Sequence, residues 1–299
     1  MHSNELFERI TQRIIADVEA GAGQFKMPWH RWGEALATPI NATTERPYRG
    51  VNVLMLWAAA EVSGYSSGRW ATYRQFAAAG AQVRKGEKST PILFWKTSTA
   101  GAVEADDAEG ATPTRRLLSK VYSVFNADQV ENLRVSAAAK LPAIERIQNA
   151  ERFFEAVGAD VRYGGDRACF IPSLDQICMP KFQQFCDAEA FYSTLAHETV
   201  HWTGAKHRLA RDLSGRFGTD AYAMEELVAE LGAAFMAGHL QISVEPRKDH
   251  SAYIKSWVRV LRGDPRAILT ASSKAQEAAD YLIAIAKPDA ATDTQKIAA

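Results

Sequence analysis

The spacing of apolar positions divides the N-terminal half of the chain into short helices and one pair of strands. Residues 4–20 repeat apolar side chains at helical spacing, and an apolar helix is predicted from about 51 to 62. Residues 82–96 turn and then alternate as a strand, and residues 117–130 resume as its partner. The acidic segment 98–114 interrupts the pair as a low-complexity insert, so we expect an exposed hairpin loop there.

The C-terminal half is patterned mainly as helices. The periodicity loosens around residues 131–143, and a helix is predicted over roughly 144–157. Three short strand-like runs follow and lead into a helix for which Asp187 is the expected N-cap. The remaining predicted helices span residues 222–240, 250–262 and 265–286.

These elements predict an α+β protein with two domains. We expect a small α+β domain first and then a mainly helical domain with a small sheet. The predicted ranges are 1–130 for the first domain, 131–143 for the linker, 144–290 for the second domain and 291–299 for a flexible tail.

Composition narrows the class of protein without naming a partner. The chain has 299 residues, 47% hydrophobic and 23% charged, which is typical of a soluble globular protein. Lys+Arg and Asp+Glu are both 35, so the net charge favours no partner. The first 130 residues hold 15 basic and 13 acidic residues, but four of those acids lie within 98–114, so the rest of this half is modestly basic.

The cysteines and the chain start predict a cytoplasmic protein. Cys169, Cys178 and Cys186 are odd in number and lack a thiolate metal-binding spacing, which favours reduced thiols. The first residues are charged and contain no apolar core of an export signal. No apolar run approaches 18 residues, so we expect no membrane span.

The segment HETVHWTGAKH, residues 197–207, carries the clearest chemistry. His197 and His201 are four apart, so on a helix they project from one face and can bind one divalent ion. Zn²⁺ is the expected ion and Mn²⁺ the alternative. Glu198 follows the first histidine, where it can act as a general base toward water. An accidental match on a surface helix is the competing interpretation, but the apolar run before His197 and the acidic helix downstream favour a metal site.

Two candidates remain for the third metal ligand. His207 completes the literal HExxHxxGxxH pattern of metzincins, which also need a methionine turn that a helix over 222–240 does not supply. Glu226 and Glu230 lie four apart on one helix face, in an ExxA(D/E) pattern similar to that of Glu-zincins. In those enzymes the first acid binds the metal and the second orients a histidine. We favour the two glutamates over His207, and Glu226 over Glu230 as the inner ligand.

Aromatic and basic residues are interleaved in the N-terminal half. Five of the seven tryptophans fall in the first 95 residues, several beside Lys or Arg. Single-strand binding needs such a pattern, because bases stack on rings while cations contact phosphates. The same aromatics can instead form the core, which we expect for Trp57 and Phe94 because both lie inside apolar runs. The candidate nucleic-acid-binding residues are Trp29, Trp32, Tyr48, Arg49, Trp70, Arg84, Lys85 and Lys88.

Taken in order, a series of segments resembles the ArdC-type antirestriction proteins of conjugative plasmids. The segments are PWHRW, PINATTERPYRGVN, WATYRQF, GAQVRKGEKSTPILFW, VFNADQVE, DQICMP, HETVHWTG and EELVAELGAAF, and they cover nearly the whole chain. The resemblance implies a single-stranded-DNA-binding domain followed by a zincin-like metallopeptidase domain. It also implies a role in protecting incoming plasmid DNA from host restriction endonucleases during conjugation.

Three functions stay open at this point. The first is a single-stranded-DNA-binding antirestriction protein that carries a zincin domain. The second is a metalloprotease that cleaves a host protein, such as a restriction subunit, and uses DNA binding for localisation. The third is a protein whose metal only holds its domain together. Whether the chain is an enzyme is therefore open as well.

Overall fold

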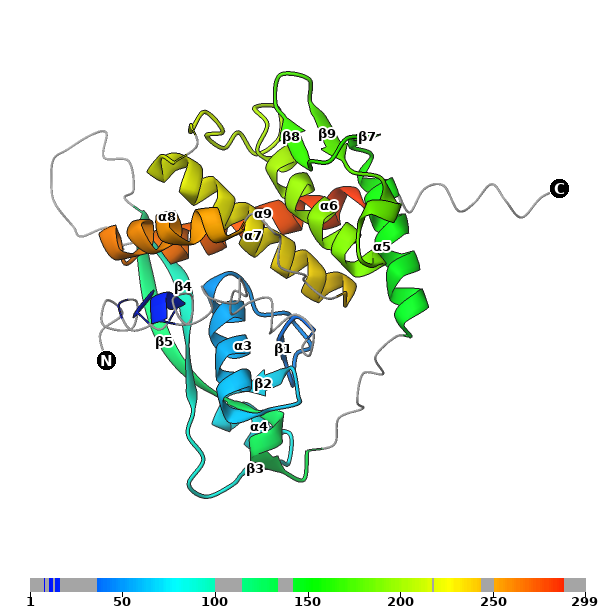
Figure 1. Cartoon of the computed structure of the whole chain (residues 1–299). Coiled ribbons are helices and arrows are strands. Elements are labelled where there is room, and N and C mark those ends of the chain that lie inside the picture. Colours follow the sequence, from blue (N-terminus) through cyan, green and yellow to red (C-terminus); the bar gives the residue numbers. More distant parts are fainter. Residues whose placement is uncertain are drawn as a thin grey trace, which may run out of the picture.

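An N-terminal sheet with its helices and a C-terminal group of helices make up the two parts of the chain (Figure 1). The computed structural model describes residues 37–99, 115–133, 142–216, 218–242 and 250–287, with a few residues between 8 and 16. Most of the predicted helix at 4–20 lies outside the described residues, as do Trp29, Trp32 and nearly all of the insert at 98–114.

The N-terminal sheet has four strands in the order β1-β2-β5-β4. Its short strands are β1 (Ile40–Asn41) and β2 (Arg69–Ala71), which pair in parallel. Its long strands are β4 (Thr90–Thr99) and β5 (Arg115–Asn126), which form an antiparallel hairpin. The hairpin confirms the two strands predicted on either side of the acidic insert.

Helix α3 (Val51–Ser63) joins this sheet to the C-terminal helices. Its sequence is almost wholly apolar and contains no glycine or proline, and it ends at Gly64 in the left-handed conformation. The Asn52 amide nitrogen donates to the Leu93 carbonyl at 2.7 Å, and the Leu93 N–H donates to Asn52 Oδ1 at 2.8 Å. This side chain therefore pairs both backbone hydrogen-bonding groups of Leu93 at the outer edge of β4. Trp57 is fully buried, as predicted, and its ring lies 6.2 Å from that of Phe235.

Shorter elements close the N-terminal part. Helix α4 (Tyr73–Ala78) begins with a capping box in which the Gln75 N–H donates to the Thr72 hydroxyl. Strand β3 (Gln82–Val83) pairs with β6 (Val130–Glu131), which follows the 3₁₀ turn η1 (Ala127–Gln129).

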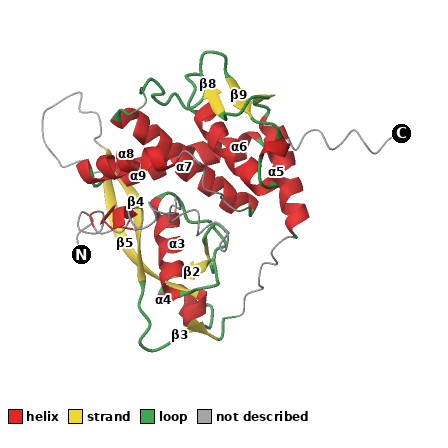
Figure 2. Ribbon diagram, in the orientation of Figure 1, coloured by secondary structure: helices red, strands yellow, loops and turns green. Residues whose placement is uncertain are grey.

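The C-terminal part begins with helix α5 (Ala143–Val157) and a three-stranded sheet (Figure 2). The strands are β7 (Asp160–Tyr163), β8 (Cys169–Ile171) and β9 (Gln176–Met179), in the order β7-β9-β8. These strands confirm the three short strand-like runs predicted before α6. β9 is the central strand, because it pairs with β7 in parallel and with β8 in antiparallel, and β8 is the edge next to helix α6.

Among the described residues, four further helices follow the 3₁₀ turn η2 (Phe182–Gln184). They are α6 (Ala188–Thr203), α7 (Asp220–Leu240), α8 (His250–Gly263) and α9 (Ala267–Ile285). α6 is capped as predicted, since the Ala190 N–H donates to Asp187 at 2.7 Å. α7 is the central helix and packs against α6, α8 and α9. None of the described helices is both long and apolar enough to cross a membrane.

One hydrophobic core runs through both parts of the chain. The Thr38 N–H donates to the Gly238 carbonyl at 3.4 Å, and the Gly50 N–H donates to Gln276 Oε1 at 2.9 Å. Arg49 forms an ion pair with Asp280 of α9. The α+β fold with a small N-terminal domain and a mainly helical second part is confirmed.

Candidate metal centre

Two histidines and a glutamate converge between helices α6 and α7. His197 and His201 project from one face of α6, and their Nε2 atoms lie 3.1 Å apart. The Glu226 carboxylate reaches them from α7, with one oxygen 3.5 Å from His197 Nε2 and the other 3.5 Å from His201 Nε2. Two nitrogens and a carboxylate therefore face the same point.

The spacing of these donor atoms fits a divalent cation. Nitrogen and oxygen ligands about 2.0–2.2 Å from a tetrahedral ion lie roughly 3.3–3.5 Å from one another. The three measured separations of 3.1, 3.5 and 3.5 Å are close to that range. Among the residues that the structure describes, this is the one group of three or more potential metal-ligating side chains. Imidazole and carboxylate donors together suit zinc and neighbouring divalent metals.

Each histidine contacts a carboxylate through its other ring nitrogen. Glu230 Oε2 lies 3.3 Å from His197 Nδ1, and Glu225 Oε1 lies 3.2 Å from His201 Nδ1. A carboxylate at Nδ1 favours a proton there, which leaves the Nε2 lone pair free to bind a metal. Glu230 was predicted among the metal ligands. Its carboxylate lies behind His197, in the orienting position that the ExxA(D/E) pattern assigns to the second acid.

Glu225 and Arg211 are site residues that the sequence analysis missed. Arg211 Nε donates to Glu225 Oε2 at 3.0 Å, and Arg211 Nη2 donates to Oε1 at 2.9 Å and to the Val200 carbonyl at 2.6 Å. The arginine therefore fastens the end of α6 to the start of α7 and holds the carboxylate that contacts His201. Glu225 resembles a solvated helix residue in the sequence, and Arg211 lies in a loop without a regular pattern.

Close approach of the two helices makes this geometry possible. Gly232 of α7 faces Val200 of α6, and a Cβ atom at Gly232 would lie 2.8 Å from Val200 Cγ2 and 2.9 Å from Cγ1. Both distances are shorter than ordinary carbon–carbon contacts of about 3.5–4.0 Å. A glycine at this position thus lets α7 lie close enough to α6 for Glu226 to reach the histidines.

The neighbouring carboxylates raise the pKa of His201, although burial alone would lower it. Burial lowers the pKa of His201, but hydrogen bonds to Glu225 and Glu226 outweigh it and raise the pKa from 6.5 to about 10. Burial likewise raises the pKa of Glu226, but hydrogen bonds to His197 and His201 outweigh it and hold this pKa well below its ordinary value. A metal-free centre therefore keeps a proton that an incoming cation must displace.

Glu198 and His207 occupy different environments. Glu198 is buried on α6, and burial together with the charge of Glu198 raises the pKa of Cys169 on β8. This coupling puts Glu198 near the edge strand of the small sheet. His207 is exposed, and its Nε2 lies 3.3 Å from Asp175. The described contacts of His207 thus give no support to a metzincin-type third ligand.

The structure changes the assignment of aromatic residues in the N-terminal half. Trp70 was predicted to contact nucleic acid, but it is only 1% exposed, so this prediction is wrong. β2 lies between β1 and β5, and the Tyr65 ring covers Trp70 at 5.9 Å. Phe94 was expected in the core, yet it is 54% exposed. Tyr48 is half-buried, and its hydroxyl donates to the Trp70 carbonyl at 3.1 Å.

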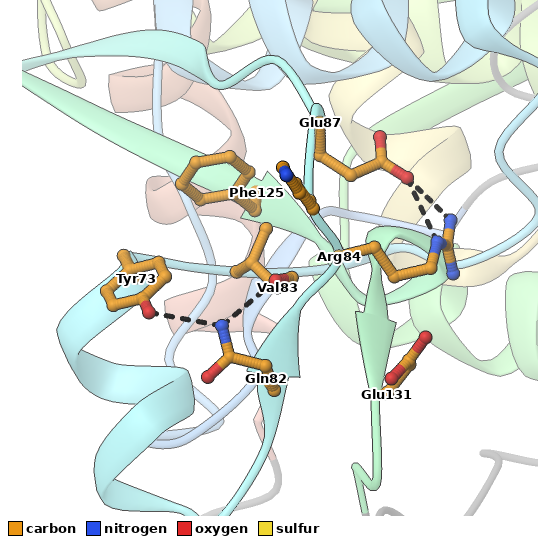
Figure 3. A pocket seen from close by; sticks show the side chains of 8 residues that line it. Tyr73, Gln82, Val83, Arg84, Glu87, Phe125 and Glu131 are labelled. Atoms are coloured by element: carbon orange, nitrogen blue, oxygen red, sulfur yellow. Dashed lines mark hydrogen bonds and ion pairs between the residues drawn. The ribbon is translucent and has the colours of Figure 1, made fainter.

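The turn that carries the predicted DNA contacts Arg84, Lys85 and Lys88 borders a groove (Figure 3). Arg84, Lys85 and Lys88 are all exposed. Arg84 is already engaged, because Nη2 lies 2.7 Å from Glu87 and 2.6 Å from the Asp128 carbonyl. The groove is lined by Tyr73, Gln82, Val83, Arg84, Lys85, Glu87, Phe125 and Glu131. Arg49, also predicted to contact nucleic acid, is exposed but paired with Asp280.

Two family descriptions match the chain, one for each part. Residues 4–125 match the N-terminal domain of anti-restriction factor ArdC, and residues 148–274 match a zincin-like metallopeptidase. The uncharacterized protein y4eC of Sinorhizobium fredii is 50% identical over 93% of this chain and 91% of its own length. Two DNA primases TraC of Escherichia coli are 36% and 35% identical over 93% and 94% of this chain. The chain spans only 27% and 21% of the length of those primases.

Solved structures agree with these matches along almost the entire chain. The metal-free crystal structure of antirestriction protein ArdC from plasmid R388 has a TM-score of 0.75 and 37% identity, and the match covers 94% of this chain and 97% of that one. The Mn(II)-bound structure of that protein has a TM-score of 0.74 and 38% identity, over 95% and 99% of the two chains. The chain belongs to the ArdC antirestriction family.

Proposed function

We propose that this ArdC-family chain binds single-stranded DNA and protects incoming plasmid DNA from restriction endonucleases. The observation that carries the proposal is the likeness to an antirestriction protein through both parts, at 37% identity over 94% of the chain. The similarity to two DNA primases also supports a role at DNA. We place this activity in the cytoplasm, where entering DNA meets the endonucleases.

The N-terminal part is the proposed DNA-binding part. Exposed cations there, including Lys85 and Lys88, can neutralise phosphates as counterions leave. Affinity for a fluorescently labelled single strand should exceed affinity for a duplex of the same sequence, and it should fall as salt rises. Equal affinity for both forms, or binding that is insensitive to salt, would contradict the proposal.

We further propose that His197, His201 and Glu226 hold a divalent metal, which the zincin-like match and the Mn(II)-bound relative support. Zn²⁺ and Mn²⁺ both suit these donors. Glu230 and Glu225 would orient the two histidines through their Nδ1 atoms. When bound, such a metal acts as a Lewis acid toward a carbonyl and makes water a stronger acid.

A DNA-localised metallopeptidase is the second candidate function. The observation that favours it is that Glu198, the residue after the donor His197 on α6, is buried. In that role Glu198 would accept the proton of the attacking water and pass it to the leaving amine. A structural metal is the third candidate, and the charged cluster that joins α6 to α7 favours it.

Two variants separate these three functions. Glu198→Gln removes the general base and keeps the donor atoms, whereas His201→Ala removes a donor. Each is scored by transfer of unmodified plasmid into restricting and non-restricting recipients, with metal content measured on the purified protein. Loss of protection in both variants, with metal retained in Glu198→Gln, supports proteolysis. Loss only in His201→Ala supports a structural metal, and retention in both leaves DNA binding as the protective activity.

A further inference from the structure

Phe94 and Tyr122 form an aromatic pair on one face of the β4–β5 hairpin. Phe94 is paired with Lys120 and Ile92 with Tyr122, so the two aromatic residues are diagonal neighbours on that face. Their rings lie 5.9 Å apart at 89°, and their exposed fractions are 54% and 37%. An exposed aromatic pair on a sheet is a recognisable feature of surfaces that bind other molecules.

The two strands that carry this pair, β4 and β5, are basic. Lys120 Nζ lies 5.2 Å from the centre of the Tyr122 ring, which makes a cation–π contact. The sequences of β4 and β5 contain four basic residues and no Asp or Glu. Lys96 and Arg116 occupy register positions of the same parity as Phe94 and Lys120. The charge of these two strands, unlike that of the acidic insert between them, is therefore complementary to a phosphate backbone.

We propose that this face is the stacking platform for single-stranded DNA, with Phe94 as the ring on which a base stacks. The proposal rests on the proposed function and assigns the site within it. Phe94, the more exposed of the two rings, offers its surface to a base, while Tyr122 supports it from the side. Lys120 contributes the cation for the adjacent phosphate.

The groove of Figure 3 is the alternative site. It also presents two aromatic rings, since Tyr73 lies 6.5 Å from Phe125 at 68°. However, its two cations, Arg84 and Lys85, are matched by Glu87 and Glu131, so the groove carries no net positive charge to attract a phosphate chain. Phe125 has the opposite strand parity to Tyr122, so the groove and the platform lie on opposite faces of β5. Substitutions at one site can therefore be tested independently of the other.

The test compares Phe94→Ala with Tyr73→Ala, because the two wild-type side chains have similar exposed fractions of 54% and 49%. Anisotropy titrations use a labelled oligo-dT strand and the full-length protein, and thermal unfolding checks that each variant is folded. Phe94→Ala should weaken binding about tenfold, within the range for one stacked base. Phe94→Trp should keep affinity close to that of the wild-type protein, whereas Phe94→Leu should lose affinity as Phe94→Ala does, because stacking needs an aromatic ring. Lys120→Ala should lower the salt slope by about 0.7, the value for one phosphate contact on a single strand.

The possible outcomes discriminate between the platform, the groove and the proposed function. Wild-type affinity in Phe94→Ala overturns the platform. Loss of affinity in Tyr73→Ala alone moves the site to the groove. Absence of single-strand binding by the wild-type protein overturns the proposed function and the platform with it. Photocrosslinking of a 5-iododeoxyuridine strand adds a direct readout, since the platform predicts adducts at Phe94 or Tyr122 and the groove predicts adducts at Tyr73 or Phe125.

Discussion

Gly232→Ala tests whether close packing of α6 on α7 sets the metal geometry. The new methyl group would begin 2.8 Å and 2.9 Å from two carbons of Val200. Normal contact needs about 3.5–4.0 Å, so the helices must separate by roughly half an ångström to one ångström. Metal ligands tolerate only about 0.2 Å of error in distance. The shift is therefore large enough to draw Glu226 away from the two histidines.

Metal affinity is a better readout of this change than stability. Overpacking costs about 1–3 kcal/mol, but replacing a helical glycine by alanine returns about 0.8–1.0 kcal/mol through helix propensity. The net loss in the free energy of unfolding is thus anywhere from about 0 to 2 kcal/mol, too wide a range to test the packing. Helix propensity does not act on the metal, so Mn²⁺ or Zn²⁺ affinity measured by calorimetry should fall by about tenfold or more.

A second substitution supplies the control. Val200→Ala removes both methyl groups that the new side chain would meet, so the double variant should recover most of the lost affinity. A double-mutant cycle then isolates the coupling between the two positions. Unchanged metal affinity in Gly232→Ala, with the helices still packed, would refute the reasoning.

Four other predictions follow from the same structure. Glu225→Ala should lower metal affinity about 10–100-fold, because His201 loses the carboxylate at Nδ1, and calorimetry measures this. His207→Ala should leave metal content unchanged by elemental analysis, whereas His201→Ala should abolish it. In metal-free protein the raised pKa of His201 contributes stability that is complete below pH 6.5 and lost as pH approaches about 10, so the urea midpoint should fall over that range. The lowered pKa of Glu226 acts in the opposite direction and contributes stability that is lost as pH falls from 4.5. Trp70→Ala should destabilise the fold by about 3–5 kcal/mol in urea titrations, because Trp70 is a core residue.

The pH, Trp70 and His207 predictions each have a control or an outcome that would contradict them. Adding Mn²⁺ should flatten the decline above pH 6.5, because a bound cation replaces the proton on His201. A decline that is equal in His201→Gln would assign it to other groups. Retention of full stability by Trp70→Ala would contradict its burial, and loss of metal in His207→Ala would restore the metzincin interpretation.

The parts of the site that sequence predicted are those fixed by local spacing. His197 and His201 lie on one helix face because four residues make about one turn. Glu226 and Glu230 follow the same rule on α7. The role of Glu225 was not predicted, because its contacts depend on how the segment after α6 folds back, and no periodicity in the sequence encodes that path.

The aromatic residues were misassigned for a related reason. Trp70 lies among polar and basic neighbours in the sequence, and Phe94 lies in an apolar run. Local polarity therefore predicted an exposed Trp70 and a buried Phe94, whereas Trp70 is buried and Phe94 is exposed. Which face of a strand is covered depends on elements far away in the chain. Trp70 belongs to the core that also contains residues of α7 and α9, whereas Phe94 and Tyr122 lie on an exposed part of the hairpin.

The packing between the two parts bears on how the metal can matter without proteolysis. α7 carries Glu226, and nine residues later Phe235 of the same helix packs against Trp57 of α3. Asn52 of α3 in turn holds both backbone groups of Leu93, the neighbour of Phe94. The helix that would bind the metal and the strand that would stack DNA are therefore parts of one continuous core. A structural metal would thus support the DNA-binding half through α7 and α3. Glu198→Gln leaves this route intact because it keeps every donor atom, whereas His201→Ala breaks it.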